Sequence, residues 1–328
     1  MDVTRVLRQG SLILGATALV ACGGGGGDSS DGGDTAVALT CESPNVPVYE
    51  LELDSEQYST QTIDISIGSN VGGILGLYSD LEEGFDLVED VRNAVTSQNA
   101  DSSGSLDCSI SGSATVTLAG TGDNTDERWQ FNECVVETVN GRKILLNGTY
   151  RNVNESTGQT SNYQTREGFE DYAITGEIIP AVDTDPSQPL AIKGRSAFVF
   201  EYEFDTEDGC VTESISGLEF TLDDRYVALT DAETRLKRAG SDTEIGIKGK
   251  LIGSSINGYV QISTPTDVLF REPETCPIEG IISLASDGEA QVLIGSSTGG
   301  TAPAVAVWIN GTSESFDDCQ DIGIAPLY

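Results

Sequence analysis

Apolar and polar residues alternate along several segments of the chain. In residues 113–120, Ala114, Val116 and Leu118 fall on one face of an extended backbone, and Thr115 and Thr117 fall on the other. Strict alternation of this kind is typical of a strand with one buried face. The sequence therefore predicts a half-buried β-strand here.

Residues 196–205 show the same alternation with larger side chains. One face of this predicted strand carries four aromatic residues, Phe198, Phe200, Tyr202 and Phe204. Nine further segments have strand-like patterns: 127–133, 143–150, 171–179, 217–222, 244–253, 258–264, 279–285, 290–295 and 304–311. Gly, Asn and Asp separate them, as turns between antiparallel strands require. We expect a mainly β fold of ten or more strands, arranged as an antiparallel meander, a sandwich or an open barrel.

One segment departs from this pattern. Near residues 77–97, apolar residues recur every three or four positions, and acidic residues lie mostly on the opposite side. This spacing predicts an amphipathic helix, which we expect to be interrupted near Gly84 because glycine is a poor helix former. The helix closes one end of the β body in one interpretation and serves as a lid or a partner-binding helix in the other.

The first residues have the layout of a secretory signal peptide. Arg5 and Arg8 precede an apolar run from Leu12 to Val20, which is too short to span a bilayer. The run ends at Leu19-Val20-Ala21-Cys22, which resembles the lipobox of bacterial lipoproteins. The resemblance implies removal of residues 1–21, acylation of Cys22 and, because Gly23 follows, retention at the outer membrane. Both orientations of the β-rich domain, toward the periplasm and toward the medium, stay as alternatives.

The composition of the chain predicts a tether after the signal peptide and excludes two classes of partner for the β-rich domain. Residues 22–38 are rich in Gly, Ser and Asp, which predicts a flexible tether before a single β-rich domain over 39–328. Without residues 1–21 the chain keeps 15 basic and 52 acidic side chains, a formal charge of −37. Nucleic acids and anionic lipids need clustered cations, so we expect neither as a partner.

Six cysteines remain besides Cys22, and an even number in an exported chain indicates disulfides. Sequence alone permits fifteen pairings of six cysteines. We favour Cys108 with Cys134 and Cys276 with Cys319, since each pair brackets a run of strands, which leaves Cys41 with Cys210.

A faint internal repeat suggests a duplicated β unit. Cys108-Ser-Ile110-Ser-Gly112 matches Cys276-Pro-Ile278-Glu-Gly280, and each is followed by Asn-Gly-Thr, at 147–149 and 310–312. We interpret both Asn-Gly-Thr sequences as tight turns. The Cys-x-Ile-x-Gly pattern, residues 129–148 and the predicted helix together resemble outer-membrane lipoproteins of Gram-negative bacteria whose function is not established. The likeness covers residues 75–150. It implies a class of protein but no catalytic or binding chemistry.

Candidate chemistry is sparse. The chain has no histidine, which excludes Ser-His-Asp and Cys-His nucleophile systems. A weak calcium site is predicted at Asp205, Glu207 and Asp208, which lack full ligand spacing; we expect no other cofactor. Trp129 lies in a strand pattern and is expected to be buried, whereas Trp308 is the better candidate for exposure.

Three functions remain open, in this order. The first is a non-catalytic, lipid-anchored envelope protein that presents an acidic β surface to a protein or polymer partner. The second is a carrier of an apolar or lipid ligand in a curved sheet, lined by Phe198, Phe200, Tyr202 and Phe204. The third is a glycan hydrolase with two facing carboxylates.

Overall fold

The computed structural model describes residues 39–52, 58–63, 68–99, 103–121, 124–160, 162–182, 185–204, 206, 208–272, 274, 276–295, 305–309 and 312–316. Fourteen strands form within these ranges: β1 (Gly104–Asp107), β2 (Ser111–Thr121), β3 (Asn124–Glu137), β4 (Lys143–Gln159), β5 (Tyr163–Ile179), β6 (Gln188–Glu203), β7 (Gly209–Leu222), β8 (Arg225–Ala239), β9 (Asp242–Gly253), β10 (Gly258–Arg271), β11 (Glu279–Ser286), β12 (Gly288–Gly295), β13 (Val305–Ile309) and β14 (Thr312–Phe316). A long helix, α3 (Gly68–Gln98), precedes them.

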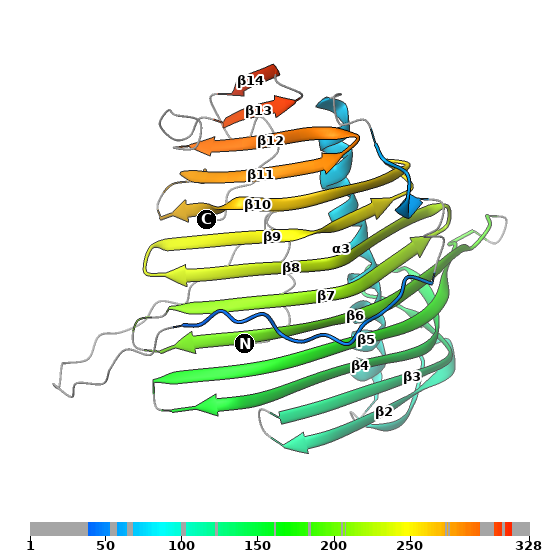
Figure 1. The fold of residues 1–328 in the computed structure, drawn as a ribbon. Coiled ribbons are helices and arrows are strands. Elements are labelled where there is room, and N and C mark those ends of the chain that lie inside the picture. Colours follow the sequence, from blue (N-terminus) through cyan, green and yellow to red (C-terminus); the bar gives the residue numbers. More distant parts are fainter. Residues whose placement is uncertain are drawn as a thin grey trace.

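The strands form one antiparallel meander, in which each strand pairs with the next along the chain from β1 to β14 (Figure 1). The sheet is not closed into a barrel, and β1 and β14 are its two edges. The prediction of a mainly β fold is confirmed, and of the three arrangements considered the meander is the one found. Successive turns therefore lie at opposite ends of the sheet, and every second turn lies at the same end as a neighbour.

The Asn-Gly-Thr prediction holds at one position only. Ile309 pairs with Thr312, so the chain does reverse between β13 and β14. Asn147, in contrast, lies within β4, where its side-chain oxygen accepts a hydrogen bond from the backbone N–H of Glu133 at 2.7 Å. Glu133 has a positive φ of 49° at a register shift of β3 against β4. The tight turn expected at 147–149 is therefore wrong, because Asn147 supports a β-bulge in the neighbouring strand.

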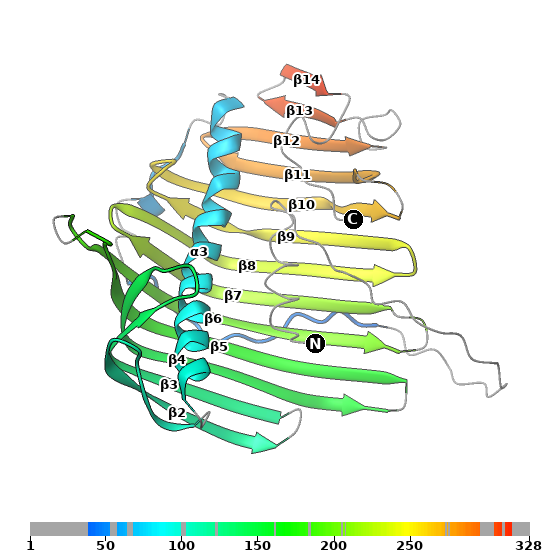
Figure 2. The same cartoon turned by 180° about the vertical axis from the view of Figure 1, so that it is seen from behind.

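α3 crosses one side of the sheet, which we call the helix face (Figure 2). It contacts β1, β3, β7, β8 and β9, and strands β3 to β6 curve toward it at one end. Its apolar residues enter the main core. Among residues 83–98, where the side chains are described, the buried apolar residues are Leu87, Val88, Val91, Ala94 and Val95. The amphipathic helix is confirmed, although it begins nine residues earlier than the pattern near 77–97 suggested.

The expected interruption at Gly84 is wrong, because α3 runs through this residue without a break. A Cβ added at Gly84 would lie 2.8 Å from Cδ2 of Phe220 on β7. Glycine stands here because an aromatic ring of the sheet approaches the helix backbone closely. The residue thus marks a packing contact.

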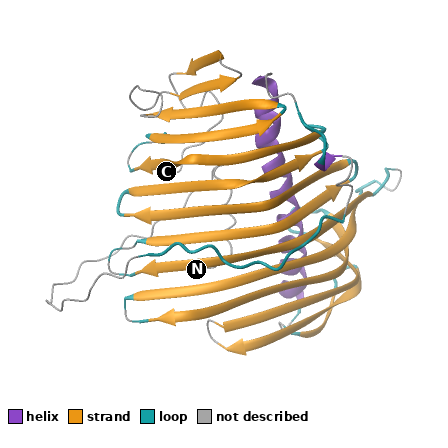
Figure 3. Ribbon diagram, viewed as in Figure 1, coloured by secondary structure: helices purple, strands orange, loops and turns teal. Residues whose placement is uncertain are grey.

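The opposite side of the sheet, which we call the segment face, carries an extended chain. Residues 39–52, the N-terminal segment, run lengthwise along β6 and β7 (Figure 3). Beside the segment a small apolar cluster is buried on this face, formed by Tyr226, Ala228 and Ile252 with Leu51, Tyr58 and Tyr259 against them. The sheet is therefore covered by different kinds of structure on its two faces.

Candidate functional site

The aromatic row predicted on β6 lies on the helix face, beyond the helix. The Phe200 and Tyr202 rings are nearly parallel, with centroids 6.0 Å apart and planes 10° from one another. The Phe204 ring meets Tyr202 edge-on, at a centroid distance of 5.3 Å. The row thus ends in two parallel rings bordered by a third at the tip of the β6–β7 hairpin.

Glycines on the neighbouring strands make room for these rings. A Cβ at Gly168 on β5 would lie 2.0 Å from the Phe198 ring, and one at Gly209 on β7 would lie 3.2 Å from Tyr202. A ring that occupies the space above a glycine of the next strand lies along the sheet. We infer that the rings cover the sheet surface, so that a ligand would meet their faces.

Exposure increases along the row toward the end of the sheet. Phe198 is only 5% exposed, Phe200 and Tyr202 are partly exposed, and Phe204 is 43% exposed. The surroundings are mixed in polarity, since Arg166 and Val211 pair with Phe200 from the two adjacent strands, and Gln164 pairs with Tyr202. The surface is therefore amphipathic, and a ligand with both ring faces and polar groups would find partners on it.

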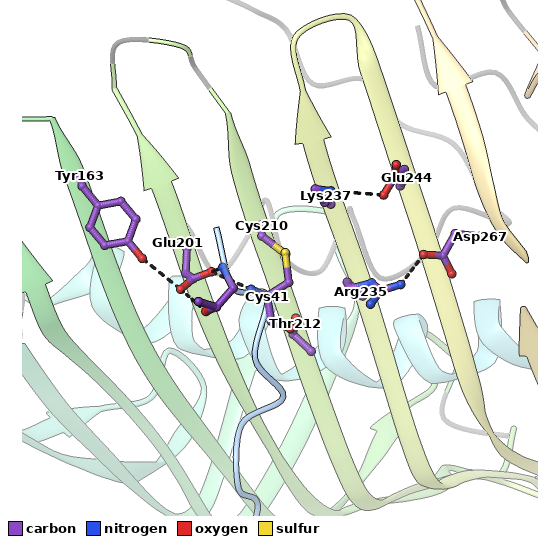
Figure 4. Close-up of a disulfide and its surroundings, with 10 residues drawn as sticks. Cys41, Tyr163, Glu201, Cys210, Thr212, Arg235, Lys237, Glu244 and Asp267 are labelled. Atoms are coloured by element: carbon purple, nitrogen blue, oxygen red, sulfur yellow. Dashed lines mark hydrogen bonds and ion pairs between the residues drawn. A yellow bond between two sulfur atoms is a disulfide. The ribbon is translucent and has the colours of Figure 1, made fainter. Parts of the chain in front are cut away.

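Two of the predicted disulfides are present. Cys41 is bonded to Cys210 at a Cα–Cα distance of 5.6 Å, and Cys108 is bonded to Cys134 at 5.4 Å. Cys319 lies outside the described residues, so its pairing with Cys276 stays a prediction. The Cys41–Cys210 bond joins the start of the N-terminal segment to the first residues of β7 (Figure 4).

Beside this disulfide, a buried carboxylate binds the N-terminal segment. Glu201 on β6 is 5% exposed. Its oxygens accept hydrogen bonds from the Thr40 N–H at 2.8 Å, the Thr40 hydroxyl at 2.7 Å, the Cys41 N–H at 2.8 Å and the Tyr163 hydroxyl at 3.0 Å (Figure 4). Burial raises the pKa of Glu201, but these donors outweigh it and hold the pKa below its ordinary value. The ionised side chain therefore fixes the start of the segment.

A second buried carboxylate binds the other end of the segment. Glu219 on β7 is 1% exposed and accepts from the Tyr49 hydroxyl at 2.8 Å, the Glu52 N–H at 2.6 Å and the Tyr226 hydroxyl at 3.2 Å. Burial and the hydrogen bond to Glu219 raise the pKa of Tyr49 far above its ordinary value, so Tyr49 remains a donor. Sequence analysis missed both glutamates as binding residues, because each looks like an ordinary polar position on a half-exposed strand.

A third polar cluster lies under the C-terminal part of α3. The Arg92 guanidinium binds both oxygens of Glu127 at 2.8 Å and stands 4.8 Å from the centroid of the Tyr150 ring. The hydroxyls of Tyr150 and Tyr172 donate to Glu170 at 2.8 Å and 3.0 Å. The Arg92–Glu127 pair joins helix to sheet, and Glu170 joins the two tyrosines of β4 and β5.

Ion pairs cover the segment face of β8, β9 and β10. Arg235 pairs with Asp267, and Lys237 pairs with Glu244 at 3.7 Å (Figure 4). Arg271 pairs with Asp242 at 2.7 Å. Lys237 and Arg271 stand opposite acids on the adjacent strand, β9. Arg235 instead reaches over Gly246 of β9 to Asp267 on β10. The charges in these pairs therefore balance one another on this part of the segment face.

Other predicted site residues fall in different places. Cys22, Asp205 and Glu207 lie outside the described residues, while Asp208 accepts a hydrogen bond from the Gly240 N–H at 2.8 Å. Among the described residues no group of three or more metal-ligating side chains gathers, so calcium stays an untested prediction. Within the same ranges no helix has the length and apolar character to cross a bilayer.

The two tryptophans behave as expected. Trp129 is 2% exposed and stacks on Phe131 with centroids 5.5 Å apart, whereas Trp308 on β13 is 46% exposed. Trp129 therefore belongs to the core. Trp308 is an isolated exposed ring and serves as a control for the aromatic row.

Comparison with known proteins assigns no relative. No model of a known protein family matches the chain, and neither a curated protein nor a solved structure matches it. A functional interpretation therefore rests on the residues and geometry described above.

Proposed function

We propose that this protein is an outer-membrane lipoprotein, anchored through acylated Cys22, that works by non-covalent binding. In this proposal the aromatic row on β6 is the contact surface, and the partner is a polymer or protein of the cell envelope. The protein is not an enzyme and needs no cofactor in this role.

The observation that carries the proposal is the row of Phe200, Tyr202 and Phe204, in which two nearly parallel rings are followed by a third, edge-on ring and exposure increases toward the end of the sheet. Aromatic faces bind ring-shaped or apolar groups over a large area at a small loss of side-chain entropy. Arg166, which pairs with Phe200 and is partly exposed beside the row, favours a partner with hydroxyl or carbonyl groups. A glycan strand of the envelope has both properties.

The buried carboxylates support contact over catalysis. A hydrolase of the glycosidase type needs two carboxyl groups that face a bound sugar. Glu170, Glu201 and Glu219 each accept two or more hydrogen bonds from neighbouring tyrosines or from the N-terminal segment. Their arrangement suits a structural role.

The net charge of the chain limits the classes of polymer or protein that bind it favourably. A formal charge of −36 for the full sequence disfavours polyanions such as nucleic acid. Neutral polymers and proteins with a basic surface remain favourable.

A carrier function is the second candidate, and one observation favours it. The row begins at Phe198, which is buried, on the same face as the apolar core beneath α3. An acyl chain lying on the exposed rings could therefore continue toward this core.

Binding assays with the mature, lipidated protein in nanodiscs separate the two candidates. Co-sedimentation with purified peptidoglycan tests the polymer, and displacement of a fluorescent fatty acid tests the carrier. We expect Tyr202→Ala to weaken peptidoglycan binding, while Trp308→Ala, the matched loss of an exposed ring, leaves it unchanged. If Tyr202→Ala weakens fatty-acid binding but leaves peptidoglycan binding unchanged, the carrier function is favoured. If Tyr202→Ala and Trp308→Ala behave alike in both assays, the proposed site is contradicted.

A further inference from the structure

The chain contains four Asn-Gly dipeptides, at 140–141, 147–148, 257–258 and 310–311. In such a dipeptide the backbone nitrogen of glycine can attack the asparagine side chain, because glycine has no Cβ to hinder the approach. The last of the four lies outside the described residues. The other three share this local sequence but stand in different backbone environments, so the fold decides which of them reacts.

Asn140-Gly141 lies in the turn between β3 and β4. The Gly141 N–H donates to the Thr138 carbonyl at 2.8 Å, and the Thr138 N–H donates to the Arg142 carbonyl at 2.8 Å. Asn140 and Gly141 are exposed, and the neighbouring Val139 is 100% exposed. A Cβ placed at Gly141 would meet nothing within 4 Å. The opening of one turn hydrogen bond at the surface therefore frees the Gly141 nitrogen to react.

Asn147-Gly148 has the same local sequence but lies inside β4. The side-chain oxygen of Asn147 accepts a hydrogen bond from the Glu133 N–H at 2.7 Å, and Asn147 pairs with Thr175 of β5. A Cβ at Gly148 would lie 2.0 Å from the carbonyl oxygen of Ala173. The side chain of Asn147 is thus engaged and its glycine is crowded, so reaction here requires two strands to separate.

Asn257-Gly258 is hindered in another way. The Asn257 N–H donates to the Ser254 carbonyl at 3.0 Å, and Asn257 has a positive φ of 49°. Gly258 is the first residue of β10 and is buried, and a Cβ there would lie 2.5 Å from the carbonyl oxygen of Gln61. The backbone of a distant segment therefore covers this dipeptide.

We propose that Asn140 is a site of self-modification, at which the folded chain converts an amide into a carboxylate. The Gly141 nitrogen gives its proton to hydroxide and forms a bond to Cγ of Asn140. The bond from Cγ to the amide nitrogen breaks, and that nitrogen takes a proton from water and leaves as ammonia. Water then opens the resulting succinimide ring at either carbonyl, which gives aspartate or isoaspartate. Water is the co-reactant, and nothing is oxidised or reduced.

The product places a negative charge in a turn that contacts the helix. Nη1 of Arg142 stands 3.6 Å from Oε1 of Glu83 on α3, and Glu83 also binds Arg225, the first residue of β8, at 3.0 Å. A carboxylate at position 140 competes with Glu83 for the Arg142 guanidinium. The isoaspartate form also lengthens the backbone of the loop by one carbon. The modification therefore acts where this turn meets α3.

The test is peptide mapping of the folded protein after incubation in mildly alkaline buffer, followed by reduction of the disulfides. Trypsin separates the three dipeptides, which fall in residues 129–142, 144–151 and 251–271, and fragmentation spectra assign the modified position. We expect conversion at Asn140 to be at least about tenfold faster than at Asn147, because an exposed turn opens far more often than a central strand.

Two controls separate the effect of the fold from that of the sequence. Asn140→Gln has a side chain one carbon longer, which closes the corresponding ring much more slowly, so conversion at position 140 should fall to background. In concentrated urea, the rates at Asn140 and Asn147 in the unsubstituted chain should come within about threefold of one another, because the strands no longer protect Asn147.

Three results would overturn the proposal. The first is conversion at Asn140 that is no faster than at Asn147 in the folded protein. The second is an unmodified Asn140 in the folded protein at a time when the chain in urea has reacted. The third is a preference for Asn140 that is as large in urea as in buffer, since the local sequence would then select the site.

Discussion

The helix face and the segment face of this sheet are covered in different ways. On the helix face, α3 and the strands bury large apolar side chains in one continuous core, including Phe220 and Leu218 of β7. On the segment face, an extended chain is held at its two ends by Glu201 and Glu219, through hydrogen bonds from backbone and hydroxyl groups.

The contrast shows how a single-layered sheet can be stabilised on both sides. Apolar burial acts through area and tolerates small adjustments of position. A buried carboxylate acts through a few donors at fixed positions, and losing either partner leaves the other without water or a replacement. The helix face therefore provides most of the stability, and the segment face holds residues 39–52 on a defined path along the sheet.

The largest expected effect lies on the helix face. Phe220→Ala removes a ring that is 2% exposed and should lower the free energy of unfolding by about 3 to 5 kcal/mol. Phe204→Ala, the same change at a 43% exposed position, should lower it by less than about 1 kcal/mol. Urea unfolding followed by circular dichroism measures both, and equal losses would contradict the assignment of the core.

The next effect tests the segment face. Glu219→Leu leaves the Tyr49 and Tyr226 hydroxyls and the Glu52 N–H without their acceptor, and should cost about 2 kcal/mol in the same urea experiment. Glu167→Leu on β5 is the control, because Glu167 is exposed. If both variants unfold at the same urea concentration, the hydrogen bonds of Glu219 contribute nothing measurable.

A smaller effect is expected where helix and sheet meet. Gly84→Ala improves helix propensity by about 1 kcal/mol, but its Cβ would lie 2.8 Å from the Phe220 ring, and such overpacking costs about 1 to 3 kcal/mol. We expect a net loss of about 1 kcal/mol. In a Phe220→Leu background the substitution should become neutral or stabilising, and a loss that persisted there would show that the ring is not its cause.

The smallest effect concerns pH. The pKa of Glu201 is lowered in the folded protein, so its contribution is complete above the ordinary value of 4.5 and is lost as the pH falls through the lowered value. Hydrogen exchange at the Thr40 and Cys41 amides, corrected for intrinsic rates, should therefore lose protection as the pH is lowered below 4.5 and through the lowered pKa. Glu201→Gln should remove most of this dependence, and Glu167→Gln should leave it intact. Protection that did not change with pH in the unsubstituted protein would rule out ionised Glu201 as the group that holds Thr40 and Cys41.

Local pattern predicted much of the fold. Alternation around Ala114 and Val116 identified a strand whose two residues are 0% and 2% exposed, and helical spacing identified Val88, Val91 and Val95 as the buried side of α3. Leu118, on the same predicted face as Ala114, is 48% exposed, because it lies toward the end of β2. Two-residue alternation predicts on which face of the sheet a side chain lies, but it does not predict whether another element covers that face at that position.

The candidate site was only half predictable. The aromatic row on β6 follows from its sequence alternation, whereas the glycines beneath its rings come from β5 and β7, which become neighbours only when the sheet forms. The same holds for Gly84, which reads as a helix breaker until Phe220 of β7, 136 positions later in the chain, is placed against it.

The sequence by itself determined the strand-like segments, the amphipathic helix and the acidic character, since these depend on periodicity and composition. It left fifteen pairings of six cysteines open, and the structure fixed Cys41 with Cys210 and Cys108 with Cys134. Only the tertiary structure decided that the strands form one open meander, and that Glu201 and Glu219 fasten a chain more than 150 residues away, as the separations of 161 and 167 residues show. The physical reason is that a hydrogen bond between distant residues leaves no local pattern, because either partner alone resembles any solvated polar side chain.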